Sequence, residues 1–158
     1  MYTAKARAAA VVYNCKIYFF GGIKAYETVI GEVDAYDVRF DRWQVLPNMA
    51  EPKYDCVAAL LGNLIYVASG TDECQQHQKS VHVFDPNRLK WRHDLRIPSM
   101  NHFHADAPAM VYNGSLYIAG QGCDHRFVEN YDPANPIWRV LQYQMIQTPN
   151  HARTHVLI

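Results

Sequence analysis

Hydrophobic residues in this chain gather in short runs that are separated by turn-forming residues. Three of these runs are alike in length and content: residues 8–13, 57–61 and 107–112. Each is followed by a two-residue turn of Asn-Cys, Gly-Asn or Asn-Gly and then by a second apolar run. Asn113-Gly114 is the strongest turn signal, because a type I′ hairpin turn needs positive φ at both central residues. The pattern predicts three β-hairpins.

A second pattern continues each hairpin. The segments VDAYD, VHVFD and VENYD each place an aromatic residue before an aspartate, and a tryptophan follows six residues later. The tryptophans are spaced by 48 and then 47 residues, and the chain has no others. Each copy therefore predicts four short strands, and four-stranded units repeated at this period predict a β-propeller. The residues that carry the pattern are Asp37, Asp85 and Asp132 with Trp43, Trp91 and Trp138.

These marks resemble the kelch repeat over residues 7–143, since paired small residues also end the second strand of each copy. Only the first copy keeps Gly21-Gly22, whereas the others hold Gly70 or Gly120 beside another residue. The resemblance implies an all-β, kelch-type propeller with blades at about 7–47, 55–97 and 106–143. We expect each tryptophan to fill the space between adjacent blades, and each aspartate to cap the turn before the fourth strand through local hydrogen bonds.

Three blades form only part of a ring, because propellers need at least about four. Kelch proteins usually have six. The last residues, HARTHVLI, place Arg153 where Arg7 stands before its own strand, so 153–158 is predicted to be the first strand of a fourth blade. A fragment, short isoform or excised segment of a longer chain explains this end better than a closed dimer, in which that strand would be surplus or would displace residues 7–13.

Composition excludes some classes of function. Lys plus Arg and Asp plus Glu are 15 each, so the net charge is zero, and no basic patch indicates a nucleic-acid or acidic-membrane partner. The apolar run at 8–12 is too short for a signal peptide, and nothing approaches the ~18 apolar residues of a membrane span. The four cysteines form no disulfide framework. We expect a soluble, cytoplasmic protein.

Histidine and cysteine pairs in the loops raise the possibility of a metal site. Cys74 and His77, His102 and His104, and Cys123 and His125 have irregular spacings, whereas structural zinc sites usually show paired ligands at regular spacing. Polar loop residues explain them better, so neither a metal nor another cofactor is expected. No GxSxG, P-loop or GxGxxG motif is present, and no catalytic residue is predicted.

The loops are the remaining candidate for function. In kelch propellers, the connections between blades and the loops between second and third strands share one side of the ring. Aromatic and arginine side chains dominate binding energy at interfaces, and several occur here where the repeat does not require them. The predicted partner-binding residues are Tyr26, Tyr54, His77, His102, Phe103, His104, Arg126 and Arg153.

The resemblance implies a protein-interaction module of the kind found in BTB–Kelch proteins. There the propeller recruits a substrate, and separate BTB and BACK domains engage a cullin-3 ubiquitin ligase. Those domains are not in this chain, so the adaptor role rests on the family. The alternatives are an enzyme of the kelch-type oxidase or sugar mutarotase class, and an actin-binding scaffold.

Overall fold

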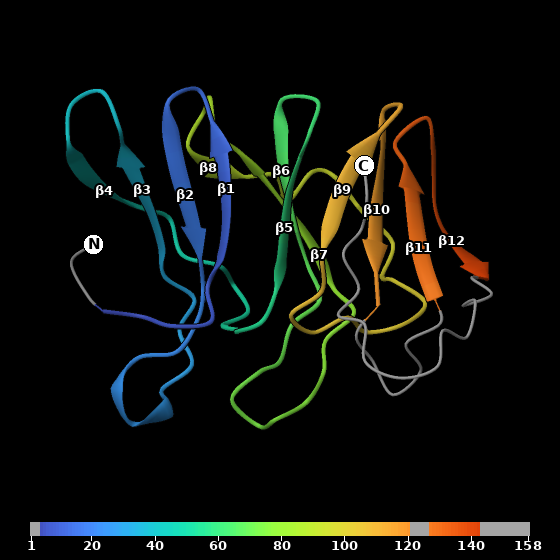
Figure 1. Ribbon diagram of the computed structural model, residues 1–158, viewed down its shortest axis with the longest axis horizontal. Coiled ribbons are helices and arrows are strands. Elements are labelled where there is room, and N and C mark those ends of the chain that lie inside the picture. The colour runs from blue at the N-terminus through green and yellow to red at the C-terminus, as the bar shows by residue number, and fades with distance from the viewer. Residues whose placement is uncertain (1–3, 121–126, 143–158) are drawn as a thin grey trace, which may run out of the picture.

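The computed structural model describes residues 4–120 and 127–142, which form three four-stranded antiparallel sheets standing side by side (Figure 1). A single short 3-10 turn, η1 (Ala25–Glu27), interrupts the otherwise all-β described chain. The predicted all-β fold with three blades is confirmed, while the strand predicted at 153–158 lies outside the described residues. Blade 1 holds β1 (Ala9–Tyr13), β2 (Lys16–Phe20), β3 (Val33–Asp37) and β4 (Arg42–Leu46); blade 2 holds β5 (Val57–Leu61), β6 (Leu64–Ala68), β7 (Val81–Asp85) and β8 (Lys90–Trp91); blade 3 holds β9 (Ala109–Tyr112), β10 (Ser115–Ala119), β11 (Phe127–Asp132) and β12 (Asn135–Gln142).

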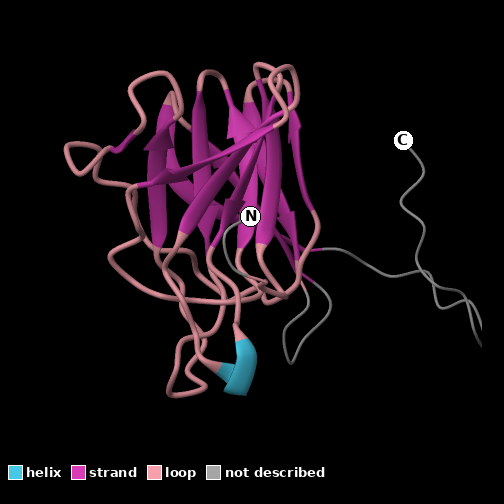
Figure 2. Cartoon of the chain, turned by 90° about the vertical axis from the view of Figure 1, so that its left-hand side faces the viewer, coloured by secondary structure: helices cyan, strands magenta, loops and turns pink. Residues whose placement is uncertain are grey.

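The strands run in sequence order within each blade, and the first strands β1, β5 and β9 pack beside one another. The tight turns between first and second strands, and between third and fourth, lie at the upper end in Figure 1. We call this end the turn side. The longer loops and the connections between blades lie at the opposite end, which we call the loop side and which also carries η1 (Figure 2).

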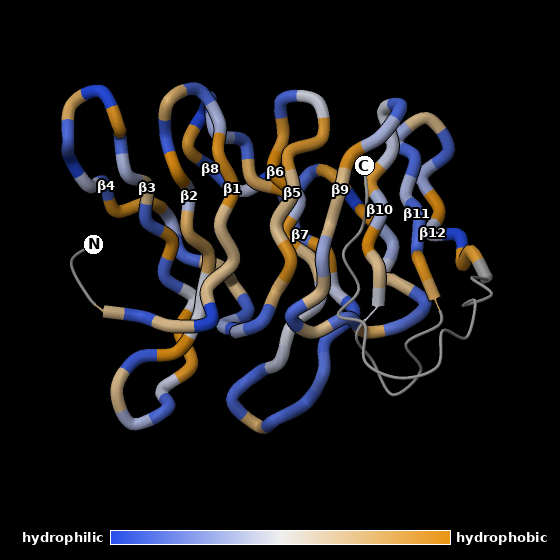
Figure 3. The backbone as a smooth tube through the Cα atoms, in the orientation of Figure 1, coloured by the Kyte–Doolittle hydropathy of each residue, from blue (hydrophilic) through white to orange (hydrophobic). Residues whose placement is uncertain are grey.

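Backbone geometry agrees with the predicted hairpins. Asn14 and Cys15 have φ of 46° and 58°, and Asn113 and Gly114 have 46° and 73°. Positive φ at both central residues is the conformation that a type I′ turn requires, and its twist suits the flanking strands. In Figure 3 the first and second strands of each blade are coloured largely as hydrophobic, the third and fourth strands are mixed, and the long loop of blade 2 is coloured largely as hydrophilic.

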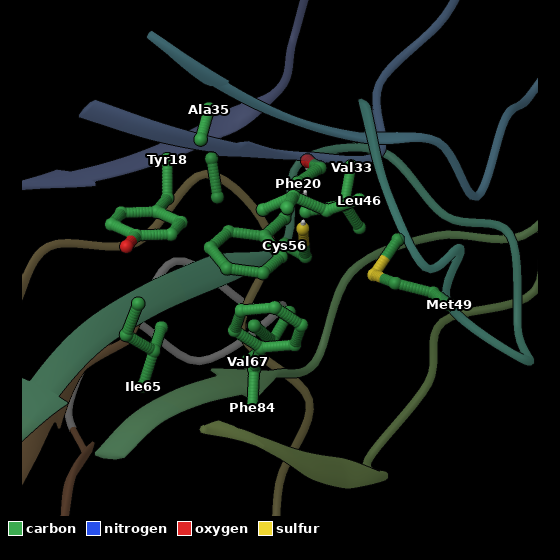
Figure 4. Close-up of a cluster of buried hydrophobic side chains, with 11 residues drawn as sticks. Tyr18, Phe20, Val33, Ala35, Leu46, Met49, Cys56, Ile65, Val67 and Phe84 are labelled. Atoms are coloured by element: carbon green, nitrogen blue, oxygen red, sulfur yellow. Dashed lines mark hydrogen bonds between the residues drawn. The ribbon is translucent and has the colours of Figure 1, made fainter. Parts of the chain in front are cut away.

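Two apolar layers hold the blades together. Each blade has a leading face, directed at the following blade, and a trailing face, directed at the preceding one. In the first layer, the leading face of blade 1 packs on the trailing face of blade 2, and Phe20 meets Phe84 with ring centroids 5.9 Å apart (Figure 4). The leading-face residues are Tyr18, Phe20, Val33, Ala35 and Leu46, and the trailing-face residues are Ile65, Val67, Phe84 and the partly buried Trp91.

The second layer repeats this arrangement between blades 2 and 3. Tyr66 from the leading face of blade 2 meets Tyr131 from the trailing face of blade 3 at 5.8 Å. Trp138 is buried in this layer, and its indole Nε1 donates to the carbonyl of Pro98 at 3.0 Å. Trp91 donates in the same way to Pro47 at 2.9 Å. In blades 2 and 3, the tryptophan therefore also holds in place, through this hydrogen bond, the connection that leads into its own blade.

The expected inter-blade position is seen for Trp91 and Trp138, whereas for Trp43 it stays a prediction. Trp43 lies on the trailing face of blade 1, which no other blade covers within the described residues. Its ring packs instead on Phe19 and Tyr36 of its own sheet, at 5.4 and 5.0 Å. The same sequence signature therefore gives a different environment, because a tryptophan's burial depends on the blade that precedes it.

The aspartates cap their turns as expected. Asp85 Oδ1 accepts hydrogen bonds from the backbone nitrogens of Asn87 and Arg88, each at 3.0 Å. Asp37 and Asp132 accept from the residues two positions further on, at 3.1 and 2.9 Å. These side-chain bonds fix the reversal of the chain before the fourth strand.

Glycine is needed where the second strand ends and the connection crosses it. Gly22 and Gly70 have φ of 105° and 102°, a conformation that other residues rarely adopt. A Cβ at Gly22 would lie 2.5 Å from the carbonyl oxygen of Ala6, and one at Gly70 would lie 2.8 Å from that of Tyr54. The glycines therefore allow each connection to pass close to the blade that it enters.

Candidate functional site

Backbone pairing ties the loops of the loop side to the connections between blades. Ile23 bridges Ala6 on one side and Val29 on the other. In blade 2, Thr71 takes the same place and bridges Tyr54 and His77. Each long loop is therefore anchored at its base, and the polar residues beyond the anchor are held above a fixed frame.

A backbone ladder links the three blades at the start of their first strands. Asp55 N donates to Arg7 O, and Asp106 N donates to Asp55 O, both at 3.0 Å. All three residues have positive φ, between 50° and 58°. Because they occupy equivalent positions, the ladder runs from blade to blade along the loop-side ends of β1, β5 and β9.

Side chains reinforce this ladder. The Arg7 guanidinium is paired with the Asp55 carboxylate, with Nε donating to Oδ1 at 2.8 Å, and it lies 4.4 Å from the centre of the Tyr54 ring. Tyr54 is only 6% exposed, and its hydroxyl donates to Gln75 at 2.9 Å. Tyr54 was predicted to contact a partner. The structure instead buries its ring beneath the long loop of blade 2, where the ring supports that loop.

Buried charges support the connections from below. In blade 1, Lys5 Nζ lies 2.9 Å from Asp34 Oδ2, and both side chains are almost wholly buried. Asp34 stands near the loop-side end of β3, so the pair joins the incoming connection to the third strand. Burying charge is costly unless it is paired, so this pair fixes the position of the connection.

Blade 2 builds the same support from different residues. Lys53 is fully buried and donates to Ser80 Oγ at 2.8 Å and to Glu51 Oε2 at 3.4 Å. Glu51 also accepts from Ser80 at 2.7 Å and lies 3.0 Å from His82 Nε2. Burial opposes ionisation of Glu51, but the hydrogen bonds from Ser80 and His82 and the charge of Lys53 outweigh it and lower its pKa to about 2. Burial lowers the pKa of Lys53, and the Glu51 charge partly offsets this.

Blade 3 uses a histidine in the place of the lysine. His104 is 1% exposed; its backbone nitrogen donates to Ser69 Oγ at 2.6 Å, and its Nε2 lies 3.2 Å from Glu129 Oε1. Glu129 also accepts from the backbone nitrogens of Asn101 and His102. Burial opposes its ionisation, yet these hydrogen bonds, that from His104 foremost, lower its pKa. His104 was predicted to contact a partner, but the structure buries it under the loops.

Two aromatic stacks cross between loops on this side. The His77 and Phe103 rings lie parallel, with centroids 4.2 Å apart, and join the long loop of blade 2 to the connection into blade 3. The His102 and Phe127 rings stack at 4.8 Å and join that connection to the start of β11. His77 is exposed, and both residues of the connection are half-buried, so these stacks form a firm and partly open surface.

Tyr26 stands apart from these stacks, on η1 in the long loop of blade 1. Its side chain is fully exposed, and its φ of 59° lies in the left-handed region. Tyr26 and His77 are therefore the predicted binding residues that are open to solvent, with His102 and Phe103 partly so. Arg126 and Arg153 lie outside the described residues.

Sequence reasoning missed the buried supports that hold these loops. The sequence carries a periodic signal for them, because residues 5, 53 and 104 are basic or histidine and stand at equivalent places before their first strands. The third strands also place Asp34 and Glu129 at one position of the repeat. Within the described part of the chain, no group of three or more His, Cys, Asp or Glu side chains could hold a metal ion. No helix there is long and apolar enough to cross a membrane.

This geometry defines a class of protein. Rigid blades hold long loops and connections on one side of a partial propeller. The charged groups beneath these connections are paired with one another, as in Lys5 with Asp34 and Lys53 with Glu51. Loops held by a rigid scaffold are where binding residues are most often found in proteins.

The comparisons with known proteins identify the family. The Kelch motif matches residues 4–50 and 52–93, which is more than half of the chain, so this protein belongs to the kelch-repeat family. The chain is 29% identical over 143 residues to an F-box/kelch-repeat protein of Arabidopsis thaliana, covering 84% of this chain and 39% of the relative. It is 26% identical over 151 residues to Kelch-like protein 25 of Xenopus tropicalis, covering 90% and 24%.

A solved structure shares the fold. The structure of YjhT matches with a TM-score of 0.70 at 15% identity, over 89% of this chain and 52% of that one. This protein thus spans about half of the solved chain and less than two fifths of either curated relative. Kelch repeats and kelch-like relatives support a protein-interaction module.

Proposed function

We propose that the loop side is a protein-binding surface, with Tyr26, His77, His102 and Phe103 among its contact residues. The observation that carries the proposal is the fully exposed Tyr26, an aromatic that the repeat does not require, on the same side as the two stacked pairs. Exposed aromatic side chains on a rigid frame supply contact area at low entropic cost, and such residues dominate binding energy at interfaces. Arg126 and Arg153 remain proposed contacts on the strength of the sequence.

We propose further that this module recruits substrates to a ubiquitin ligase in the cytoplasm. The support comes from the relatives, which include a kelch-like protein and an F-box/kelch-repeat protein. Engagement of cullin-3 would need BTB and BACK domains, so a coding sequence for a BTB domain upstream of this chain supports that role. A coding sequence for an F-box there would indicate another class of ligase.

An enzyme is the second candidate, but no observation favours it. Two acids of the loop side are engaged in structural pairs, Glu129 with His104 and Glu51 with Lys53. We therefore propose a function without catalysis.

The test compares two exposed aromatics at opposite ends of blade 1. Tyr26→Ser removes a side chain from the loop side, and Phe40→Ser removes one that is 63% exposed in the turn between β3 and β4, on the turn side. Tagged protein is captured from cells, and its co-purifying proteins are measured by quantitative mass spectrometry. We expect Tyr26→Ser to reduce recovery of specific partners about tenfold or more, since an anchor contributes ~2 kcal/mol.

The control variant should keep those partners. Tyr26→Ser removes no buried surface and Phe40→Ser removes only the smaller, buried part of one side chain, so both proteins should melt close to the wild type. Partners that survive Tyr26→Ser and His77→Ala but disappear with Phe40→Ser would place binding on the turn side and contradict the proposal.

A further inference from the structure

Two apolar faces of the partial ring are uncovered among the described residues. One is the trailing face of blade 1, and the other is the leading face of blade 3. Exposed apolar surface of this kind marks interaction sites in soluble proteins. The two interfaces inside the chain show what kind of surface each face accepts.

The trailing face of blade 1 has the composition of a buried inter-blade surface. Ile17, Phe19 and Tyr36 are partly exposed. Their counterparts are at most 2% exposed in the two blades that have a preceding neighbour: Ile65, Val67 and Phe84 in blade 2, and Leu116, Ile118 and Tyr131 in blade 3. Their side chains are of the same apolar kind, so the missing neighbour accounts for the difference.

The leading face of blade 3 shows the same effect from the other side. Leu141 pairs with Val128 in the register in which Leu46 pairs with Val33. Leu46 is 4% exposed beneath blade 2, whereas Leu141 is 43% exposed. The face continues over exposed Ile137, Met110 and Tyr112.

A polar group on this face also lacks a partner. Asn130 stands where blades 1 and 2 have Ala35 and Val83, and it is more than nine-tenths buried by its own blade. Its Nδ2 has no hydrogen-bond acceptor among the described residues. A buried donor without an acceptor costs free energy, and an acceptor on a covering surface would satisfy it.

The sequence favours completion of the ring by a longer chain, in which residues 153–158 begin a fourth blade. For the 158-residue chain by itself, we propose instead that two copies associate head to tail, with the leading face of blade 3 in each copy covering the trailing face of blade 1 in the other. The proposed contact is of the type seen twice inside the chain, since each places a leading face on a trailing face. A head-to-tail contact between unlike faces gives a closed ring only if the rotation that relates the two copies also brings the second pair of faces together; otherwise it gives an open-ended chain of copies. Two copies supply six blades, and one copy covers 52% of the YjhT chain, so two copies together have about the length of that chain. The chain's net charge of zero imposes no overall repulsion between copies.

Sedimentation velocity of the 158-residue protein tests this association over about 1 to 100 µM, a range set by ordinary weak affinities. We expect a species of twice 18.2 kDa that dissociates on dilution. Val45→Glu, on the trailing face, and Leu141→Lys, on the leading face, should each weaken dimerisation at least tenfold. Val38→Glu is the matched control: Val38 is 55% exposed, against 62% for Val45, but lies in a turn outside both faces.

Mixing the variants tests the head-to-tail arrangement. A pair formed from one Val45→Glu chain and one Leu141→Lys chain has one unmodified contact and one contact that joins opposite charges. The mixture should therefore dimerise more tightly than either variant alone. Because both substituted positions are already exposed, far-UV circular dichroism should show unchanged folding.

Three outcomes would overturn the proposal. If the wild-type chain stays monomeric at every concentration, the two faces are not covered by a second copy and would instead be available to other segments, such as further repeats of a longer polypeptide. Open-ended oligomers would show that the rotation does not close. A dimer that neither substitution weakens would use a different surface.

Discussion

Replacing tryptophan by alanine at the three equivalent positions should give graded losses of stability. Trp138 is buried between blades 2 and 3, packs at a tilt against Tyr131 with ring centroids 5.2 Å apart, and donates to the carbonyl of Pro98. Trp138→Ala should lower the free energy of unfolding by about 3–5 kcal/mol, because it opens a cavity between two blades. Trp91→Ala should cost about as much or somewhat less, since Trp91 keeps partial exposure.

Trp43 is the internal control, because it has the same place in the repeat but no covering blade among the residues that the structure describes. Its ring is half-buried against its own sheet. Because less apolar area changes its exposure to water, Trp43→Ala should lower the free energy of unfolding by only about 1–2 kcal/mol. For a chain of this size the Trp138 change should lower Tm by roughly 6–20 °C, at about 2–4 °C per kcal/mol.

Urea unfolding followed by far-UV circular dichroism measures these losses, because tryptophan fluorescence would itself change with the substitutions. Protein concentrations must be low enough to keep the chain monomeric. Equal losses of stability at Trp43 and Trp138 would show that burial between blades does not determine the cost of removing the tryptophan.

Two further predictions concern side chains that fix the backbone. Asp85→Ala should destabilise the protein by about 1–3 kcal/mol through loss of two capping bonds, and Asp85→Asn, which keeps an acceptor oxygen, should cost less in the same urea titration. Glu51 should make stability pH-dependent: its folded pKa of about 2 lies below the ordinary value of ~4.3, so its contribution is present above about pH 4.3 and is lost as pH falls toward 2. Glu51→Gln should flatten the acid side of the unfolding midpoint plotted against pH, and an unchanged slope would show that Glu51 is not held as described.

The blade architecture could be predicted because its signals are local and repeated. Asn113-Gly114 specifies its hairpin turn through backbone conformation, and Asp85 caps a turn within three residues of itself. Alternating apolar residues then assign the faces of each strand. None of these inferences needs knowledge of distant contacts.

The loop-side supports could not be predicted in the same way, because they join residues far apart in the sequence. Lys53 meets Ser80, and blade 2 takes its acid from the connection at Glu51, where blades 1 and 3 take theirs from the third strand. The burial of Tyr54 likewise depends on the conformation of a connection. Trp43 shows that a local signature does not fix burial. Its sequence pattern matches that of Trp138, although no described blade covers it.

Site-specific photo-crosslinking in cells can show which side of the blades touches a partner. A photoreactive phenylalanine analogue is placed at Tyr26 on the loop side or at Phe40 on the turn side, both being exposed aromatic positions of blade 1. The cells are then irradiated, and the tagged protein is recovered under denaturing conditions. A loop-side binding surface predicts partner adducts from position 26 and few or none from position 40. Adducts from position 40 alone would contradict it.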